Sequence, residues 1–339
     1  MQRTKIQDVA ALAGVSVSTV SRVVNNSDYP VTAEKRDRVR RAVRELNFSP
    51  SQVARNLRTN KSKLIALVVA DIANPYFAGI ARAMDEFLFH EGYGLIISST
   101  DESPDREKGI LNRLRDQDVD AIVISSSGQN ISLLELLHKE GFPVMLLDRN
   151  IEELHMPFIG SDNVRECCIL TQYLIDKGHR SILFLAGSLD STTGKERLQG
   201  YRKALLKNRI EYDDSLVLHG NFMRDETYRL SVDFFDNRSD RATAVVSSNN
   251  LMSEGFLEAA FDRKISIPQQ YSLVSFGSID NQRLITPILT CYRQNLEMIG
   301  KLTAQMTLQM INESSGNADV PQNLVINDVF VEGKSVGTI

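Results

Sequence analysis

The sequence predicts an α+α/β chain with a three-helix helix-turn-helix head, a short joint and a two-lobed, doubly wound α/β body. Three observations support this prediction. The first 48 residues carry three amphipathic helical patterns, short apolar runs alternate with helical patterns from Leu64 onward, and positive charge gathers in the first fifth of the chain. The length of 339 residues exceeds the usual size of one domain, so we expect two or three domains.

The head begins with KIQDVAALAGVSVSTVSRVVN, residues 5–25, which reads as two short helices joined by a tight turn. Gly14 suits a turn position that needs a positive φ, and Ser16 can cap the second helix by accepting a backbone N–H. The apolar residues that recur at helical spacing are Ile6, Val9, Ala10, Ala13, Val20, Val23 and Val24.

The outward face of the second helix starts with the short side chains of Val17 and Ser18, and Ser21 and Arg22 follow one turn later. Such a helix can enter a DNA major groove and place a guanidinium at a base edge. Thr32 can cap a third helix that runs to about Leu46. Its apolar stripe is Val39, Ala42, Val43 and Leu46, and its polar surface is Lys35, Arg36, Arg38, Arg40, Arg41 and Arg44.

The charge distribution separates the head from the body. The whole chain carries −4, but residues 1–63 hold 13 Lys and Arg against 5 Asp and Glu, a net +8. The remaining 26 basic and 38 acidic residues sum to −12. A basic head on an acidic body is typical of a phosphate-binding module attached to a domain that does not bind nucleic acid.

The joint, residues 49–62, reads SPSQVARNLRTNKS and separates a head at 1–48 from a body at 63–339. Pro50 ends the preceding element, and Val53, Ala54 and Leu57 share one face of a helix too short to persist alone in water. A flexible linker with Leu57 packed on the body is the alternative.

The body alternates β-rich apolar runs with helices, which is typical of parallel sheets covered on both faces. About 270 residues with this many strands favour two lobes, with a ligand at the carboxyl ends of the strands. The runs are LIALVVA (64–70), YGLIISS (93–99), DAIVISSS (120–127), PVMLLD (143–148), RSILFLAG (180–187), TAVVSS (243–248) and YSLVSF (271–276). The helices are expected near 76–90, 106–116, 131–140, 163–177, 193–208, 225–235 and 251–261.

Polar and aromatic side chains follow these strands, as expected for a polyhydroxylated ligand. Rings stack on sugar faces, and Asp, Asn and Arg pair with hydroxyl groups that would otherwise be buried without partners. The candidate segments are 71–77, 99–101, 125–127, 148–149, 162–163, 188–197, 249–250 and 276–280.

Several classes of function lack support in the sequence. The three cysteines, Cys167, Cys168 and Cys291, have no metal-ligand spacing and are expected to be small buried residues. Common hydrolase, nucleotide-binding and zinc-protease motifs are missing and the five histidines are scattered, so we expect no catalytic residue, metal or cofactor. No apolar run reaches the roughly 18 residues of a membrane helix, so we expect a cytoplasmic protein.

The stretch DVAALAGVSVSTVSRVVN, residues 8–25, resembles the N-terminal signature of the lactose-repressor (LacI/GalR) family of bacterial transcription regulators. The likeness continues through SPS (49–51) and VARNL (53–57) and, more weakly, to the C-terminus. It implies that the joint is a hinge helix whose two copies insert Leu57 into the DNA minor groove. The DNA-binding residues that it implies are Thr4, Val17, Ser18, Thr19, Ser21, Arg22, Asn25, Arg55, Leu57 and Arg58.

For the body, the resemblance implies two lobes of periplasmic-binding-protein type. One lobe comprises 63–161 and 293–322, and the other comprises 162–292 and 323–339. The effector-binding positions that the resemblance implies are Tyr76, Phe77, Asp148, Arg149, Thr193, Arg197, Phe222, Asn249 and Gly277.

Gly277 departs from the family pattern, which commonly has an aspartate there. A missing carboxylate removes a hydroxyl acceptor and one negative charge. With Arg149, Lys195 and Arg197 nearby, we therefore expect a sugar acid or sugar phosphate more than a neutral sugar.

These features imply a transcription repressor of carbohydrate-use genes that binds pseudo-palindromic double-stranded operator DNA as a homodimer and is switched by a sugar-like effector. No leucine heptad follows residue 333, which favours a dimer over a tetramer. A DNA-binding head fused to a sugar-converting enzyme is the alternative, and the ligand can act as inducer or corepressor.

Overall fold

The computed structural model describes residues 4–25, 29–48, 61–238, 241–280, 284–313 and 323–339. The chain forms two compact units, residues 1–62 and 63–339, and this division falls where the sequence predicted the end of the joint. The predicted hinge helix, with Arg55, Leu57 and Arg58, lies outside the described residues.

The head contains α1 (Ile6–Ala13), α2 (Val17–Val24) and α3 (Ala33–Glu45), as predicted. Gly14 ends α1 at φ 60°, and the Ser16 hydroxyl caps α2 by accepting the N–H of Thr19. Thr32 stands at the start of α3, but the prediction of a side-chain cap there was wrong, because its hydroxyl makes no capping hydrogen bond. Fully buried valines from the three helices form the centre of a small core: Val9, Val20 and Val39.

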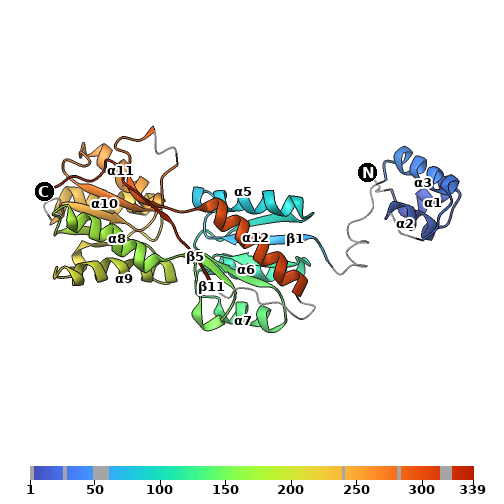
Figure 1. The fold of residues 1–339 in the computed structure, drawn as a ribbon, viewed down its shortest axis with the longest axis horizontal. Coiled ribbons are helices and arrows are strands. Elements are labelled where there is room, and N and C mark those ends of the chain that lie inside the picture. Colours follow the sequence, from blue (N-terminus) through green and yellow to red (C-terminus); the bar gives the residue numbers. More distant parts are fainter. Residues whose placement is uncertain (1–3, 26–28, 49–60, 239–240, 281–283, 314–322) are drawn as a thin grey trace. The chain divides into compact units, whose positions relative to one another are not determined.

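The first lobe of the body is built on a parallel sheet with the order β11-β5-β4-β3-β1-β2. One face packs against α5 and α12, which lie side by side, and the other face packs against α6 and α7 (Figure 1). The strands are β1 (Leu64–Val69), β2 (Gly94–Ser99), β3 (Ala121–Ile124), β4 (Val144–Leu147), β5 (Phe158–Ser161) and β11 (Asn323–Ile326). The helices are α5 (Pro75–His90), α6 (Pro104–Asp116), α7 (Ile131–Lys139) and α12 (Leu296–Glu313), with a short 3₁₀ turn at Glu152–Leu154.

The second lobe repeats this plan with the order β12-β10-β9-β8-β6-β7, in which only β12 runs antiparallel to its neighbour. Helices α8 and α9 cover one face, and α10 and α11 cover the other. The strands are β6 (Ile182–Ala186), β7 (Val217–His219), β8 (Ala244–Ser247), β9 (Ser272–Phe276), β10 (Thr290–Arg293) and β12 (Val329–Val331). The helices are α8 (Asn163–Asp176), α9 (Thr192–Lys207), α10 (Arg224–Arg238) and α11 (Asn250–Asp262), with a 3₁₀ turn at Asp214–Leu216.

All seven predicted strands and all seven predicted body helices are present, whereas five strands and α12 in the described part of the body were not predicted. The missed strands, β5, β7, β10, β11 and β12, have three or four residues with at most three consecutive apolar ones, which is a weak signal for a strand. One lobe boundary was wrong. Residues 323–326 form β11 beside β5 in the first sheet, so the chain returns to the second lobe after Ile326. Likewise, β10 extends the second lobe to Arg293.

Two further expectations can be compared with the structure. Cys167 and Cys291 are buried, as predicted, whereas Cys168 is only half-buried, and all three are free thiols. Among the described residues, no helix combines the length and apolarity needed to cross a membrane.

Candidate functional site

A cavity of about 540 Å³ opens at the carboxyl ends of the strands in both lobes of the body. Its walls come from the loops after β1, β2, β4, β7, β8 and β10 and from the first turns of α5, α9, α10 and α11. This volume is within the range that small-molecule sites occupy in proteins. The cavity lies at the carboxyl ends of the strands, is walled by loops and is large enough for a small molecule. It is therefore the candidate ligand site.

The predicted effector-binding residues gather here with one exception. Eight of the nine line the cavity: Tyr76, Phe77, Asp148, Arg149, Thr193, Arg197, Phe222 and Asn249. Gly277 does not line it but lines a small hollow beside Tyr76 and Asn250, so its role in effector binding stays a prediction. Gly277 adopts φ 87°, a conformation that L side chains rarely adopt, because the chain turns sharply after β9.

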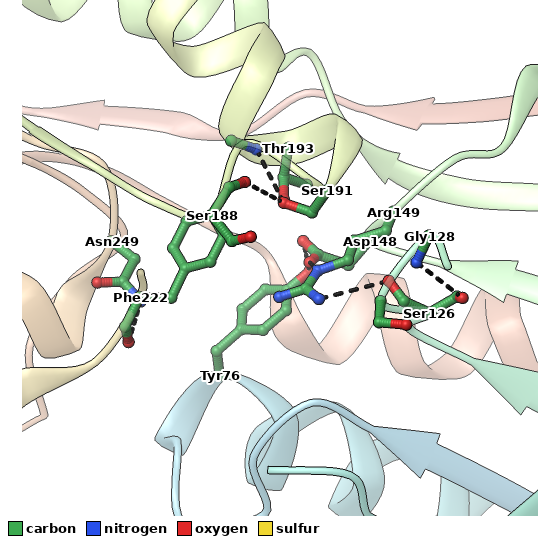
Figure 2. Close-up of polar contacts among 12 residues, drawn as sticks. Tyr76, Ser126, Gly128, Asp148, Arg149, Ser188, Ser191, Thr193, Phe222 and Asn249 are labelled. Atoms are coloured by element: carbon green, nitrogen blue, oxygen red, sulfur yellow. Dashed lines mark hydrogen bonds and ion pairs between the residues drawn. The ribbon is translucent and has the colours of Figure 1, made fainter. Parts of the chain in front are cut away.

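Phe222 supplies an aromatic wall of the cavity. Its ring packs so closely on Gly187, at the end of the β6 run, that a Cβ at that glycine would collide with it. Phe222 itself adopts φ 64°, which is uncommon for an aromatic residue. Figure 2 shows the rings of Phe222 and Tyr76 beside the guanidinium group of Arg149. Backbone strain at a non-glycine residue with positive φ is typical of functional sites, where the surrounding structure holds a side chain in a position that its backbone disfavours.

Asp148 organises the polar side of the cavity. Its Oδ1 accepts a 3.0 Å hydrogen bond from the Tyr76 hydroxyl and lies 3.9 Å from Nη2 of Arg197. Burial raises the pKa of the Tyr76 hydroxyl well above its ordinary value, and the Asp148 carboxylate raises it further. Tyr76 therefore remains a hydrogen-bond donor and joins the aromatic wall to the charged wall.

Arg197 is held by two directed hydrogen bonds from its own lobe. Its Nε donates to Oδ1 of Asn163 at 2.8 Å, and its Nη1 donates to the carbonyl of Ser248 at 2.7 Å. The guanidinium stacks on the ring of Phe276, with Cζ 3.8 Å from the centroid. Only 5% of Arg197 is exposed, so its side chain has little freedom to move. Its Nη2 group lies toward Asp148 and the cavity.

Arg149 forms a bidentate ion pair with Glu102, through hydrogen bonds of 2.8 and 2.5 Å. Burial lowers the pKa of Arg149, but the carboxylates of Glu102, Asp148 and Glu107 together raise it above its ordinary value, so the guanidinium keeps its proton. Both buried arginines of the cavity therefore already have carboxylate neighbours inside the protein.

The charge argument for an anionic ligand does not hold in this structure. Lys195 is exposed and does not line the cavity, and Arg149 and Arg197 face Glu102 and Asp148. The lining carboxylates outnumber the lining guanidinium groups by six to three. The two sets are Asp71, Asp101, Glu102, Asp148, Asp225 and Glu254, and Arg149, Arg197 and Arg224.

Several lining residues were not among the predicted positions. Glu102, Met223, Arg224, Asp225, Leu251, Glu254 and Gln294 also line the cavity. Three of them follow β7 and one follows β10, strands without a sequence signal. Glu102, Leu251 and Glu254 lie just beyond the predicted candidate segments. Extending the segments 99–101 and 249–250 by one residue would have included Glu102 and Leu251.

In the head, the predicted DNA-binding residues fall into two groups. On α2, Val17 is 42% exposed, Ser18 is exposed, and Thr19, Ser21 and Arg22 are half-buried, so their side chains lie at the surface of this helix. Thr4 and Asn25 use their side chains inside the head: Thr4 donates to the carbonyl of Leu46, and Asn25 donates to the carbonyl of Ser21.

Arg22 is the only charged residue of α2, and its guanidinium stacks on the ring of Tyr29 with Cζ 3.8 Å from the centroid. Ser16 shares hydrogen bonds with the hydroxyls of Ser18 and Thr19, so the first turn of α2 presents a cluster of hydroxyl groups. Hydroxyls and a helix N-terminus are groups that contact DNA phosphates and base edges.

A helix-turn-helix head on a two-lobed α/β body with a small-molecule cavity defines a class: DNA-binding regulators with a ligand-binding body of periplasmic type. The comparisons with known proteins support it. The family model described as "Bacterial regulatory proteins, lacI family" matches residues 5–51, and "Periplasmic binding proteins and sugar binding domain of LacI family" matches residues 62–334. The chain belongs to the LacI family of bacterial transcription regulators.

Individual relatives agree with this membership. The chain is 33% identical to the HTH-type transcriptional repressor PurR of Proteus mirabilis (strain HI4320) over 335 residues, 98% of this chain and 96% of that protein. It is 32% identical to PurR of Pasteurella multocida (strain Pm70), over 91% of this chain and 92% of that protein.

Solved structures show the same fold. The regulator CelR in its cellobiose complex has 29% identity and a TM-score of 0.71, covering 98% of this chain and all of that one. The Lac repressor dimer bound to operator and the anti-inducer ONPF has a TM-score of 0.84 over 99% of this chain and all of that one. At 23% identity, the Lac repressor likeness concerns the fold alone.

Proposed function

We propose that this protein is a repressor of carbohydrate-use genes that binds a pseudo-palindromic operator as a homodimer and responds to a small, uncharged, polyhydroxylated effector. The observation that carries the effector assignment is the cavity, where aromatic rings line the same space as arginine and carboxylate groups that already have partners inside the protein. The protein acts on the chromosome, so its proposed location is the cytoplasm.

The charge of the lining favours an uncharged effector. An anion would add negative charge to a wall with six carboxylates and three guanidinium groups, whereas a hydroxyl group can both donate and accept without changing the charge. Phe222 and Tyr76 supply ring faces for the apolar side of a sugar. The structurally similar CelR, 29% identical to this chain, is in complex with cellobiose, an uncharged sugar.

The DNA-binding part of the proposal rests on α2. One short recognition helix reads only a few base pairs, so specific binding requires two heads on a symmetric dimer. Val17, Ser18 and Arg22 are the proposed base readers. Effector and operator affinities are linked reciprocally, and either induction or corepression uses the same parts. Operator affinity measured with and without the effector shows whether the effector acts as an inducer or as a corepressor.

Two measurements test this function. Thermal-shift screening against neutral sugars, sugar acids and sugar phosphates, followed by calorimetric titration, should find a stabilising neutral sugar. Binding of acids or phosphates alone would contradict the effector class. Footprinting on DNA upstream of carbohydrate-use genes should find protection of one palindrome, and uniform protection of all DNA would contradict the regulator assignment. Head variants such as Val17→Ala should alter the operator preference and leave effector affinity unchanged.

A further inference from the structure

Glu102 reaches into the cavity from the loop between β2 and α6 and covers the guanidinium of Arg149. Nη1 and Nη2 of Arg149 each donate to one carboxylate oxygen of Glu102. This fork geometry is the one with which arginine binds a ligand carboxylate or phosphate. Arg149 is 4% exposed, and its Nη1 also contacts the carbonyl of Ser126 at 3.3 Å. The anion-binding edge of the arginine is therefore occupied by a group of the protein itself.

The loop that carries Glu102 has an unusual backbone. Asp101 and Glu102 both adopt positive φ, 51° and 55°, although neither is glycine. The Glu102 N–H donates to the carbonyl of Ala70 at 3.2 Å, Asp101 pairs with Arg106, and Ser103 caps α6. Contacts on both sides thus hold a conformation that the residues themselves disfavour. The fold positions this carboxylate firmly, rather than leaving it on a free loop.

We propose that Glu102 is a specificity-determining residue of the effector pocket, which occupies the anion-binding edge of Arg149 and thereby excludes ligands that carry a carboxylate or phosphate group. The inference rests on the proposed function, in which this cavity binds the effector. An anionic ligand could reach Arg149 only by displacing Glu102. The displaced carboxylate would then stay without its partner beside Asp101 and Asp148, two further lining carboxylates.

A simple anion tests this without knowledge of the effector. Inorganic phosphate is titrated into the full-length protein, and the melting temperature is followed. We expect no specific stabilisation of the wild type and a saturable shift for Glu102→Gln, because the neutral amide frees one edge of Arg149 without removing the side chain. The double variant Glu102→Gln, Arg149→Gln should lose the shift. Glu102→Ser provides the same test if Glu102→Gln does not fold.

Asp105→Asn is the matched control, since Asp105 is an exposed carboxylate in the first turn of α6 outside the cavity lining. It removes the same charge three residues away and should behave as wild type. Phosphate stabilisation of the wild type that Arg149→Gln abolishes, a shift beyond the wild-type value in Asp105→Asn, or no additional shift in any folded Glu102 variant would each overturn the proposal.

The effector itself provides the second readout. For a neutral sugar found in the screen and its uronic acid, Glu102→Gln should improve the affinity for the acid at least tenfold and change the affinity for the neutral sugar much less. An unchanged ratio would contradict the role of Glu102. If no sugar binds the wild type but phosphate still binds Glu102→Gln through Arg149, the proposed effector class fails. The exclusion of anions from Arg149 by Glu102 remains supported in that case.

Discussion

Asn250 of the second lobe donates a 2.9 Å hydrogen bond to Oδ1 of Asn74 in the first lobe, and both side chains are buried beside the cavity. The same oxygen accepts the N–H of Tyr76 and so caps α5. Oδ1 of Asn74 therefore takes part both in the contact between the lobes and in the cap of α5, the helix that carries Tyr76.

Asn250→Ala should weaken effector affinity about fivefold, because the arrangement of lobes around the ligand loses a hydrogen bond of about 1 kcal/mol. Calorimetric titration measures this. Asn237→Ala is the control, since Asn237 is exposed and its side chain donates a hydrogen bond to Asp233 on its own helix. An Asn250 variant with unchanged affinity would show that this contact does not help to hold the binding arrangement.

Arg197→Ala should abolish the effector response while operator binding persists. It should also lower the free energy of unfolding by about 3 kcal/mol, since it leaves a buried carboxylate, Asp148, without one of its cationic neighbours. Denaturant unfolding and operator-binding assays measure the two effects. Arg202→Ala, an exposed arginine of the same helix that bonds Tyr212, should change neither. A normal effector response in the Arg197 variant would remove this residue from the site.

Glu166 and Asp328 should make stability depend on pH. Burial, and then the nearby Asp328, raises the pKa of Glu166 to about 9, far above the roughly 4.3 of an exposed glutamate. The folded state therefore holds a proton that the unfolded state releases between these values. Stability is highest at the acidic end of this window and falls as the pH rises toward 9, by at most about 1.4 kcal/mol per pH unit for one proton.

Glu166→Gln should flatten this slope, which denaturant unfolding at pH 5, 7 and 9 measures. The amide keeps the size of the side chain but cannot ionise beside Asp328. Glu297→Gln, which alters a carboxylate at the exposed start of α12, serves as control and should keep the wild-type slope. An identical slope in the Glu166 variant would assign the pH dependence to other groups.

Tyr29 should support base reading by Arg22. The stacked ring limits the positions of the guanidinium, so its loss should reduce discrimination at the base pair that Arg22 is proposed to read. We expect Tyr29→Ala to reduce the preference for the operator over a single-base variant by about two- to fivefold, in line with roughly 0.5–1 kcal/mol for an exposed cation–π contact. Tyr29→Phe should retain the preference. In an Arg22→Ala background, Tyr29→Ala should have no further effect; an equal effect there would show that the ring acts independently.

Local signals in the sequence determined much of this protein. The turn at Gly14 and the cap at Ser16 follow from backbone preferences of single residues, and the long apolar runs identify strands that are buried on both faces. The division into a basic head and an acidic body is a property of composition. The positions of Tyr76 and Arg197 followed from the family resemblance and from their place after predicted strands.

The tertiary structure decided what the charged groups in the cavity do. Counting Arg149, Lys195 and Arg197 suggested an anionic ligand, but only the packing shows that Lys195 is exposed and that Arg149 is paired with Glu102, 47 residues away. Short strands such as β11 likewise depend on pairing with β5, which lies far away in the sequence. Helices and long strands follow from neighbouring residues, whereas the charge available to a ligand depends on contacts between distant ones, which no local pattern encodes.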